Sequence, residues 1–428
     1  MNNSIRHSIL VFSGVFLLLS SSYAQVYSDE MYWVTSKLNQ DSLSPAHQDR
    51  GMVQTRFSYL YNSTAITNNF FKKLVYQKTY IDEEDKQDVV SRLKAQNKMG
   101  VDFSTSLFGT IRCKKDSTIL FDLGIGYRDF TYANFTKDLF KLVFEGNAQY
   151  AGENAKVGPS ILKQWSYASF FVGAQKILSK EMVVGARVSL IKAGFYRETK
   201  FEEGSLYTDP NGAYVDLSAP FTWKSQARPD NPFSANNGWG GSVDLYAQRW
   251  FKKSVLSFEI RDLGVVNWKN MNTYTGDQTY RYEGEFIGDI LAPGNSFITD
   301  VKLDSVAKEL GIENNVQNVT SMLPTKLQLS YLYKTSEKWS VKGDLNYMFL
   351  KGYLPYLKLS AYYALLPKVY IVPVVVIGGY GKVNTQLGIS ATVAQHWTVQ
   401  ANVMVLDYLI APKKYSGHGV DVYLTKTF

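Results

Sequence analysis

Two residues near the end of this sequence carry the side chains of a hydrolase. Ser416 and His418 could supply a nucleophile and its general base, and on a strand they would share a face, because residues i and i+2 point the same way. Such chemistry also needs a third group that orients the imidazole and a site for an oxyanion. The sequence indicates neither, so a solvated serine and histidine is the favoured interpretation. The chain is therefore not expected to be an enzyme.

Metal and phosphate chemistry have equally weak support. The acidic runs 82–85 and 202–203 would attract calcium, but the first lacks the alternating ligands and the turn glycine of a calcium loop. The sequence contains no HExxH and no CxxC. The glycine-rich stretch 378–382 joins two expected strands, so no helix N-terminus stands behind its amides. We expect no metal and no cofactor, and we interpret the single cysteine, Cys113, as an inert turn residue.

The final segment predicts how these residues are positioned. Its apolar side chains share one parity: Val420, Val422, Leu424 and Phe428. Its polar side chains share the other: Asp421, Tyr423, Thr425 and Thr427. A strand places alternate residues on opposite faces, so one face can meet lipid and the other a polar lumen. This pattern predicts a transmembrane β-barrel of the outer membrane.

The last residue adds a second signal. The chain ends on an aromatic side chain, Phe428, as membrane barrels characteristically do, and the barrel-assembly machinery reads such a residue. We therefore assign Phe428 as an assembly signal. Lys426 departs from the apolar parity, which a lysine near the barrel rim can do by extending its amine to the interface.

The beginning of the chain predicts export. Arg6 and His7 precede an apolar run, residues 9–19, that is too short to span a bilayer as a helix, and small residues follow it. We interpret residues 1–24 as a signal peptide, 25–50 as an N-terminal segment and 51–428 as the barrel. No other stretch is apolar enough for a spanning helix.

Composition supports this interpretation weakly. Thirty Tyr, 24 Phe and eight Trp would fill two aromatic girdles, although two soluble β domains are an alternative. No mid-chain linker rich in Pro, Gly or Ser supports that alternative. The 46 Lys and Arg exceed the 38 Asp and Glu, and cations near rims can pair with membrane lipid and lipopolysaccharide. No basic block with interleaved aromatics is present, so nucleic acid is not an expected partner.

Alternating segments of about the length of a tilted membrane strand recur along the chain. The clearest are 51–61, 100–112, 117–128, 324–334, 339–349, 353–364, 369–379, 384–394, 397–409 and 417–428. Short connections between them predict an up-and-down meander. Pro373 cannot donate to a ladder, so a bulge or local break is expected there.

Connection lengths predict which end of the barrel faces out. With 16 strands the long connections fall on one side: 62–99, 129–161, 195–212, 287–323 and 410–416. The short ones fall on the other: 113–116, 178–181, 267–272, 335–338, 365–368 and 395–396. Membrane barrels have long outer loops and short periplasmic turns. The stretch 225–239 breaks this rule, and a 14-strand barrel results if one middle hairpin lies outside the wall.

Four loop insertions have helical patterns. Phe70, Phe71, Leu74 and Val75 share a helical face, and acids at 82–85 begin a segment that runs to about Gln96. Thr136 is placed to cap 138–144, and Asp300 to cap a helix through Leu310. Such apolar stripes usually pack against their own barrel, and the alternatives are the membrane surface or the pore mouth.

Several stretches resemble a known family: Asn68 to Asn97, Phe140 to Asn147, and Asp262-Leu263-Gly264 with Trp268. It is an uncharacterised family of outer-membrane barrels common in Bacteroidetes-type bacteria. That family is distantly similar to FadL-type long-chain fatty-acid transporters, which typically have 14 strands, and to the type IX secretion barrel. The resemblance places Ser44-Pro45-Ala46 where those transporters have an Asn-Pro-Ala stretch that leads into a lumenal plug. It implies that the 26 residues from Gln25 to Arg50 form a short segment inserted in the lumen.

The sequence leaves two functions open. The first is a passive channel or binding barrel for small hydrophobic molecules, which the resemblance implies. The second is a scaffold that docks a protein partner through the long loops 129–161 and 287–323. A hydrolase that uses His418 is a distant third.

Overall fold

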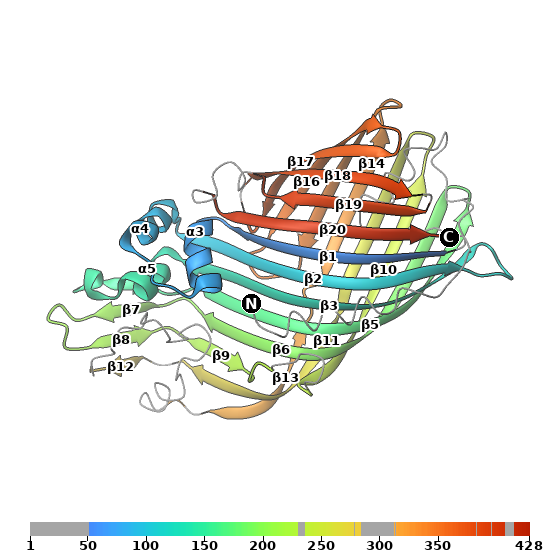
Figure 1. The fold of residues 1–428 in the computed structure, drawn as a ribbon. Helices are drawn as coiled ribbons and strands as arrows, with labels where there is room; N and C mark the ends of the chain where they lie inside the picture. Colours follow the sequence, from blue (N-terminus) through green and yellow to red (C-terminus); the bar gives the residue numbers. More distant parts are fainter. Residues whose placement is uncertain are drawn as a thin grey trace.

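The computed structural model describes residues 51–229, 236–277, 279–283, 312, 314–381, 383–394, 396–406 and 415–428. Within these residues the chain forms a closed antiparallel β-barrel (Figure 1). The barrel closes because the last strand pairs with the first, with Met52 opposite Thr427 and Asn62 opposite Gly417. Closure leaves no long open edge of the kind that promotes aggregation.

Sixteen strands contribute to this sheet. They are β1 (Gly51–Ser63), β2 (Gln96–Arg112), β3 (Ile119–Thr136), β5 (Ser160–Ser179), β6 (Met182–Phe201), β9 (Phe221–Ser225), β10 (Gly238–Trp250), β11 (Ser254–Gly276), β13 (Asn315–Met322), β14 (Lys326–Lys334), β15 (Trp339–Met348), β16 (Leu354–Leu366), β17 (Val369–Gly379), β18 (Val383–Ala394), β19 (Trp397–Met404) and β20 (Gly417–Thr427).

The wall of the described barrel nevertheless has 14 positions. β9 and β10 both lie between β6 and β11, so they are two pieces of one wall strand. β13 and β14 both pair with β11 and are likewise two pieces of one strand. The predicted barrel is confirmed with the smaller of the two strand counts.

The hairpin that the 14-strand alternative required lies outside the wall. It belongs to a second sheet, in the order β12 (Tyr280–Tyr282), β8 (Val215–Ser218), β7 (Ser205–Thr208) and β4 (Asn154–Lys156). This sheet extends beyond one end of the barrel, near the helices (Figure 1). At the other end the connections 113–118, 180–181, 251–253, 335–338, 367–368 and 395–396 are all short. The predicted asymmetry of long loops and short turns is therefore confirmed, although two connections at the loop end, 349–353 and 380–382, are short as well.

One predicted turn is wrong, because three strands run further toward the loop end than the sequence indicated. β3 continues to Thr136, β6 to Phe201 and β11 to Gly276, so the predicted turn 267–272 lies inside β11. Its polar residues Asn267 and Lys269 are exposed at strand positions. These residues are polar because this part of β11 extends beyond the lipid-facing part of the wall into water. The short connection at this point is 251–253 instead.

The stretch 225–239 is not an inner connection. Ser225 pairs with Arg197 and Asn272, and Trp239 pairs with Lys192 and Asn267, so the stretch interrupts one wall strand near its loop end. The effect of Pro373 is partly as predicted. Its ladder to β18 continues through Leu387 without a bulge, whereas pairing with β16 is interrupted between Val374 and Ile371. A proline has no N–H to donate to that neighbour.

The alternation in the last strand is confirmed. Asp421, Tyr423 and Thr425 are buried, whereas Val420 and Val422 are partly exposed on the other face. The buried parity is the interior, because Tyr246 on β10 and Tyr370 on β17 belong to one buried cluster although four wall strands separate them. Apolar side chains of the opposite parity are exposed on the outer face, including Phe121, Leu123, Ile125, Phe170, Val172, Val188 and Leu190.

The loop helices gather at the loop end of β1 to β3, where an apolar cluster joins them to these strands (Figure 1). They are α3 (Asn68–Phe71), the π-helix η1 (Lys72–Gln77), α4 (Glu83–Arg92), α5 (Lys137–Glu145) and the 3₁₀ turn η2 (Ala148–Tyr150). Thr136 caps α5 as predicted, whereas Asp82, which was expected in the first turn of α4, is the residue that caps it. α4 ends before the predicted Gln96, because β2 begins there. The predicted helix at 300–310 lies outside the described residues.

Three of the four residues in the first predicted stripe pack as expected. Phe70 and Phe71 are buried, and Leu74 packs against the same apolar cluster. Val75 is 44% exposed instead. The reason is the π-helical turn, whose i→i+5 hydrogen bonds rotate Val75 away from the face that Phe71 occupies.

Candidate functional site

A chain of six aromatic rings crosses the barrel interior near the loop end. The ring centroids of Trp268 (β11) and Tyr196 (β6) are 5.0 Å apart, and those of Tyr196 and Trp165 (β5) are 6.0 Å apart. The chain continues from Trp165 to Phe130 (β3) at 5.4 Å and from Phe130 to Tyr380 at 6.1 Å. It ends at Tyr353, 5.0 Å from Tyr380.

All six rings are buried. Four lie on strands, whereas Tyr380 lies in the β17–β18 connection and Tyr353 lies just before β16. Tyr380 rests against Gly100 of β2, where a Cβ would come within 2.4 Å of its ring. A glycine is required at this position because the ring occupies the space that any side chain would fill.

An ion network centred on the buried Arg128 lies next to this chain. The Arg128 guanidinium stacks 4.9 Å from the ring centroid of Phe130 and donates to Asp102 from Nε (3.0 Å) and Nη2 (2.6 Å). Its Nη1 also lies 3.4 Å from Asp262 Oδ2 on β11. Lys326 Nζ is 3.9 Å from Asp102 Oδ2. Buried charges require such partners, since an unpaired one would be strongly destabilising.

A backbone bulge sets the position of Asp262. Asp262 has φ of 55°, which an aspartate tolerates better than most residues, and its amide donates to Asp244 Oδ1 at 2.8 Å. The β10–β11 register shifts at Asp244, and the pairing of β11 passes from β14 to β13 at the same level. Gly264 follows, where a Cβ would lie 2.1 Å from Gly241 O. The Asp262-Leu263-Gly264 motif thus directs a carboxylate into the interior.

A second node is centred on Asp122, whose side chain is fully buried. It accepts hydrogen bonds from Thr110 (2.6 Å), Gln175 (2.9 Å), Arg187 (3.1 Å) and Tyr246 (2.6 Å). These donors come from β2, β5, β6 and β10, so one carboxylate joins five strands across the interior. In the sequence this node is indicated only by Asp122 itself, a charged residue at the inward position between Phe121 and Leu123.

The β18–β20 side of the interior carries uncharged amides. Asn402 donates to Gln386 Oε1 at 3.1 Å, and Gln386 donates to Asn384 Oδ1 at 3.3 Å. Gln400 is fully buried, and among the described residues neither atom of its carboxamide has a hydrogen-bond partner. The interior therefore differs from side to side: rings and ion pairs lie on β3 to β11, neutral amides lie on β18 and β19, and an Arg56–Asp421 ion pair joins β1 to β20.

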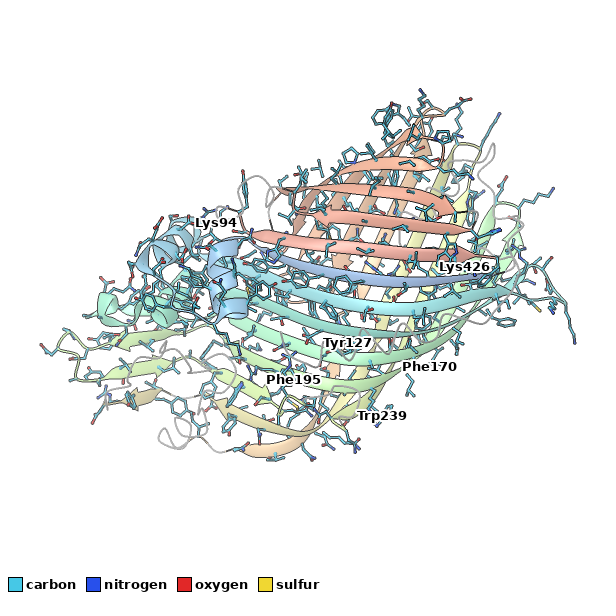
Figure 2. The ribbon with its side chains drawn as sticks, in the orientation of Figure 1. Lys94, Tyr127, Phe170, Phe195, Trp239 and Lys426 are labelled. Atoms are coloured by element: carbon cyan, nitrogen blue, oxygen red, sulfur yellow. The ribbon has the colours of Figure 1, made fainter. Side chains whose placement is uncertain are left out.

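The outer face shows the lipid-facing pattern and the interrupted wall strand. Figure 2 shows Tyr127, Phe170 and Trp239 along the outer face of β3, β5 and β10. Where the ladder is missing, Gln226 Nε2 donates to Asn237 O (3.1 Å) and Asn237 Nδ2 donates to Gly194 O (2.7 Å). These side chains satisfy backbone groups that the interruption would leave unpaired.

His418, which was considered with Ser416 as a hydrolase pair and expected to be solvated, is half-buried and has structural contacts. His418 Nδ1 lies 2.9 Å from Asn68 Oδ1, and its Nε2 lies 3.4 Å from the Tyr76 hydroxyl. These contacts attach α3 and η1 to the start of β20. In the described part of the chain no three His, Cys, Asp or Glu residues gather as a metal site. Cys113 is a free thiol in the β2–β3 turn.

Phe428 lies at the seam where the barrel closes. Its amide donates to Gly51 O at 2.9 Å, and its ring covers Gly51, where a Cβ would be 2.8 Å away. Lys426 Nζ lies 5.3 Å from the ring centroid of Trp397 and 5.7 Å from that of Phe428. An amine over aromatic rings at the rim is the arrangement expected of a lysine that reaches the interface.

A closed antiparallel wall, an apolar outer face and a polar interior define an outer-membrane β-barrel. None of the described helices has the length and apolarity needed to cross a membrane. The chain belongs to the family of unknown function DUF5723, whose model matches residues 51–397. No curated protein matches the chain.

Solved structures of similar shape are outer-membrane channels. A mutant of the TodX monoaromatic hydrocarbon channel has a TM-score of 0.46 at 7% identity, with 96% of each chain covered. The toluene transporter TbuX of Ralstonia pickettii has a TM-score of 0.45 at 8% identity, covering 92% of this chain and 93% of its own. A FadL homologue of Pseudomonas aeruginosa has 0.44 at 9% identity, covering 89% and 90%. The function proposed below rests on the interior of this barrel.

Proposed function

We propose that the protein is a passive outer-membrane channel or binding barrel for small hydrophobic molecules. The observation that carries this proposal is the chain of six buried rings from Trp268 to Tyr353. Ring faces and edges accept apolar and aromatic molecules without leaving desolvated polar groups unpaired. Tyr353 and Tyr380 lie on connections and not on strands, so their displacement disturbs the wall least. They are the rings expected to move aside for a ligand.

Uptake into proteoliposomes tests this function. Vesicles that contain the protein should take up a labelled fatty acid or a labelled small aromatic faster than empty vesicles. Tyr380→Ala should change that rate severalfold. Tyr363→Ala is the matched control and should leave the rate unchanged, because Tyr363 lies on the outer face of β16 with its ring centroid 4.7 Å from that of Trp339. Equal rates with and without protein across a broad panel would count against the proposal.

We also propose that residues 1–24 are removed on export and that residues 25–50 enter the lumen. β1 begins at Gly51 at the short-turn end, so the proposed lumenal segment would join the wall at that end of the barrel. Deletion of 25–50 should raise single-channel conductance in planar bilayers. Unchanged conductance would place the segment outside the lumen.

A second candidate function is a scaffold that docks a protein partner. It is favoured by the second sheet and α5, which extend beyond the barrel end (Figure 1). Arg281 and Asp216, with an Nη2–Oδ2 distance of 2.7 Å, join β12 to β8 in that sheet. Photocrosslinking from exposed positions in 137–159 in living cells discriminates the two functions. A specific protein adduct would support docking, and adducts with lipid or lipopolysaccharide alone would argue against it.

A further inference from the structure

The segment Lys72–Tyr80 projects from the outer face of the barrel with an unusual surface. The six residues from Val75 to Tyr80 are all exposed, and three of them are apolar or aromatic: Val75 at 44%, Tyr76 at 53% and Tyr80 at 60%. The π-helix η1 produces this exposure by rotating Val75 outward. The segment then turns at Lys78, which has φ of 51°.

This surface is continuous with the lipid-facing wall. The Tyr76 hydroxyl contacts the hydroxyl of Tyr59 on β1, whose side chain shares the outward parity of Phe57. Phe57 is 43% exposed and packs against Phe103 of β2 at 5.5 Å between ring centroids. Two residues of a strand span about 7 Å, so Tyr76 lies roughly that far along the wall from an apolar side chain in the band. Through Phe103, Tyr59 lies level with Asp129 of β3, so the exposed apolar parity of the wall ends near this level.

The lysines in and near this segment are of two kinds, those with an ion-pair partner and those without one. Lys73 is paired with Asp82 and Asp85, and Lys86 is paired with Glu83. Lys72 and Lys78 are exposed, and no ion pair joins either of them to another described residue. The two unpaired cations alternate with the exposed apolar and aromatic side chains along the segment, which is the pattern of a segment that lies in a membrane interface.

We propose that Lys72–Tyr80 docks on phosphate-bearing lipid headgroups of the outer leaflet. Val75, Tyr76 and Tyr80 enter the interface, and Lys72 and Lys78 pair with the phosphates. Tyrosine is favoured at this depth because its ring is apolar and its hydroxyl remains hydrated. A protein partner fits less well, since the five residues are far fewer than the roughly 20–30 per side of a standard interface. The inference depends on the membrane placement of the barrel and not on what the lumen carries.

Native mass spectrometry of the detergent-purified full chain with lipid A as the probe tests the charged contacts. The double variant K72E/K78E should weaken lipid A binding at least about fivefold. The matched control is K114E/K115E, which reverses two exposed lysines in the β2–β3 turn at the opposite end and should bind as the parent does. Equal loss in both variants, or no loss in either, would overturn the proposal. A dimer that K72E/K78E dissociates would assign the surface to a second copy and would also overturn it.

A depth measurement in nanodiscs tests the apolar contacts independently of charge. A nitroxide at Tyr80→Cys, in a Cys113→Ser background, should be more accessible to oxygen than to a water-soluble nickel complex. The reference is the same label at Asn211→Cys, an exposed position in the β7–β8 turn of the second sheet. Matching accessibilities at the two positions would show a hydrated loop and contradict the docking. Neither experiment uses transport, so failure here and failure of the channel function are distinguishable.

Discussion

Arg128 on β3 and Asp262 on β11 meet inside the barrel, with 3.4 Å between Nη1 and Oδ2, although β5, β6 and β10 separate their strands in the wall. The same guanidinium forms two hydrogen bonds to Asp102 and stacks on Phe130. One side chain therefore joins the ion network to the aromatic chain. The buried side chains of the β3–β11 half of the interior pack against one another as a core.

Arg128→Ala should destabilise the barrel by about 3–5 kcal/mol, because it removes the buried cation that Asp102 and Asp262 share. Urea unfolding in detergent micelles, followed by tryptophan fluorescence, measures the change. Arg92→Ala is the control: its pair with Asp88 is partly exposed on α4 and should contribute no more than about 1 kcal/mol. Similar losses in the two variants would mean that the interior network has no special role.

Gly100→Val should displace Tyr380 and so break the ring chain between Phe130 and Tyr380. A Cβ at residue 100 would come within 2.4 Å of that ring, and such overpacking costs about 1–3 kcal/mol. Uptake of a labelled aromatic into proteoliposomes should change in the same direction as in Tyr380→Ala. Gly109→Val, on the outward parity of the same strand, is the matched control. An unchanged rate in Gly100→Val would separate Tyr380 from the pathway.

The alternation of side chains was sufficient to predict the barrel, because each strand independently shows one lipid-facing parity. The strand count was less certain for a physical reason. β9 and β10 resemble two strands along the chain, and only their shared neighbours β6 and β11 reveal one interrupted wall strand. The polar residues of 267–272 indicated a turn because a strand beyond the membrane loses the apolar parity that identifies it.

The candidate site was not predicted from the sequence. Asp122 and Arg128 were visible as charges at inward positions, but their partners Arg187 and Asp262 are fixed by closure of the wall. Likewise, the ring chain joins residues 130, 165, 196 and 268 with residues 353 and 380. Local pattern gives the face of each side chain, whereas contact across the barrel depends on register and strand number.

Helix α4 should be lost in acid before α5. Its cap, Asp82, accepts from Asp85 N (3.0 Å) and from Lys73 Nζ (2.6 Å), and the hydrogen bond from Lys73 lowers the pKa of Asp82. A lowered folded-state pKa gives stability that is present above the unfolded value, about 3.9, and is lost as pH falls through the folded value. The same hydrogen bond raises the pKa of Lys73, so that contribution persists through neutral pH and is lost only in strong alkali.

Hydrogen exchange of 83–92 between pH 6 and pH 3, corrected for the intrinsic rate, measures this loss. The internal control is α5, whose cap is the uncharged Thr136 hydroxyl, which accepts from Leu139 N at 3.1 Å. Protection of 137–145 should fall less over the same range. Parallel loss in both helices would point to general acid unfolding and away from the Asp82–Lys73 pair.

Phe428→Ala should reduce the amount of inserted barrel more than it reduces the stability of the folded barrel. Phe428 N donates to Gly51 O (2.9 Å) at the seam, and this backbone contact survives the substitution. The ring covers Gly51 at the rim, so its loss removes little buried core. If the assembly machinery reads the terminal ring, the heat-modifiable band in the outer-membrane fraction should fall severalfold in Phe428→Ala and persist in Phe428→Tyr. Unfolding of the purified variants in detergent should differ little from the parent. Normal insertion of Phe428→Ala would contradict the assignment, because the closing hydrogen bond alone would then be sufficient for assembly.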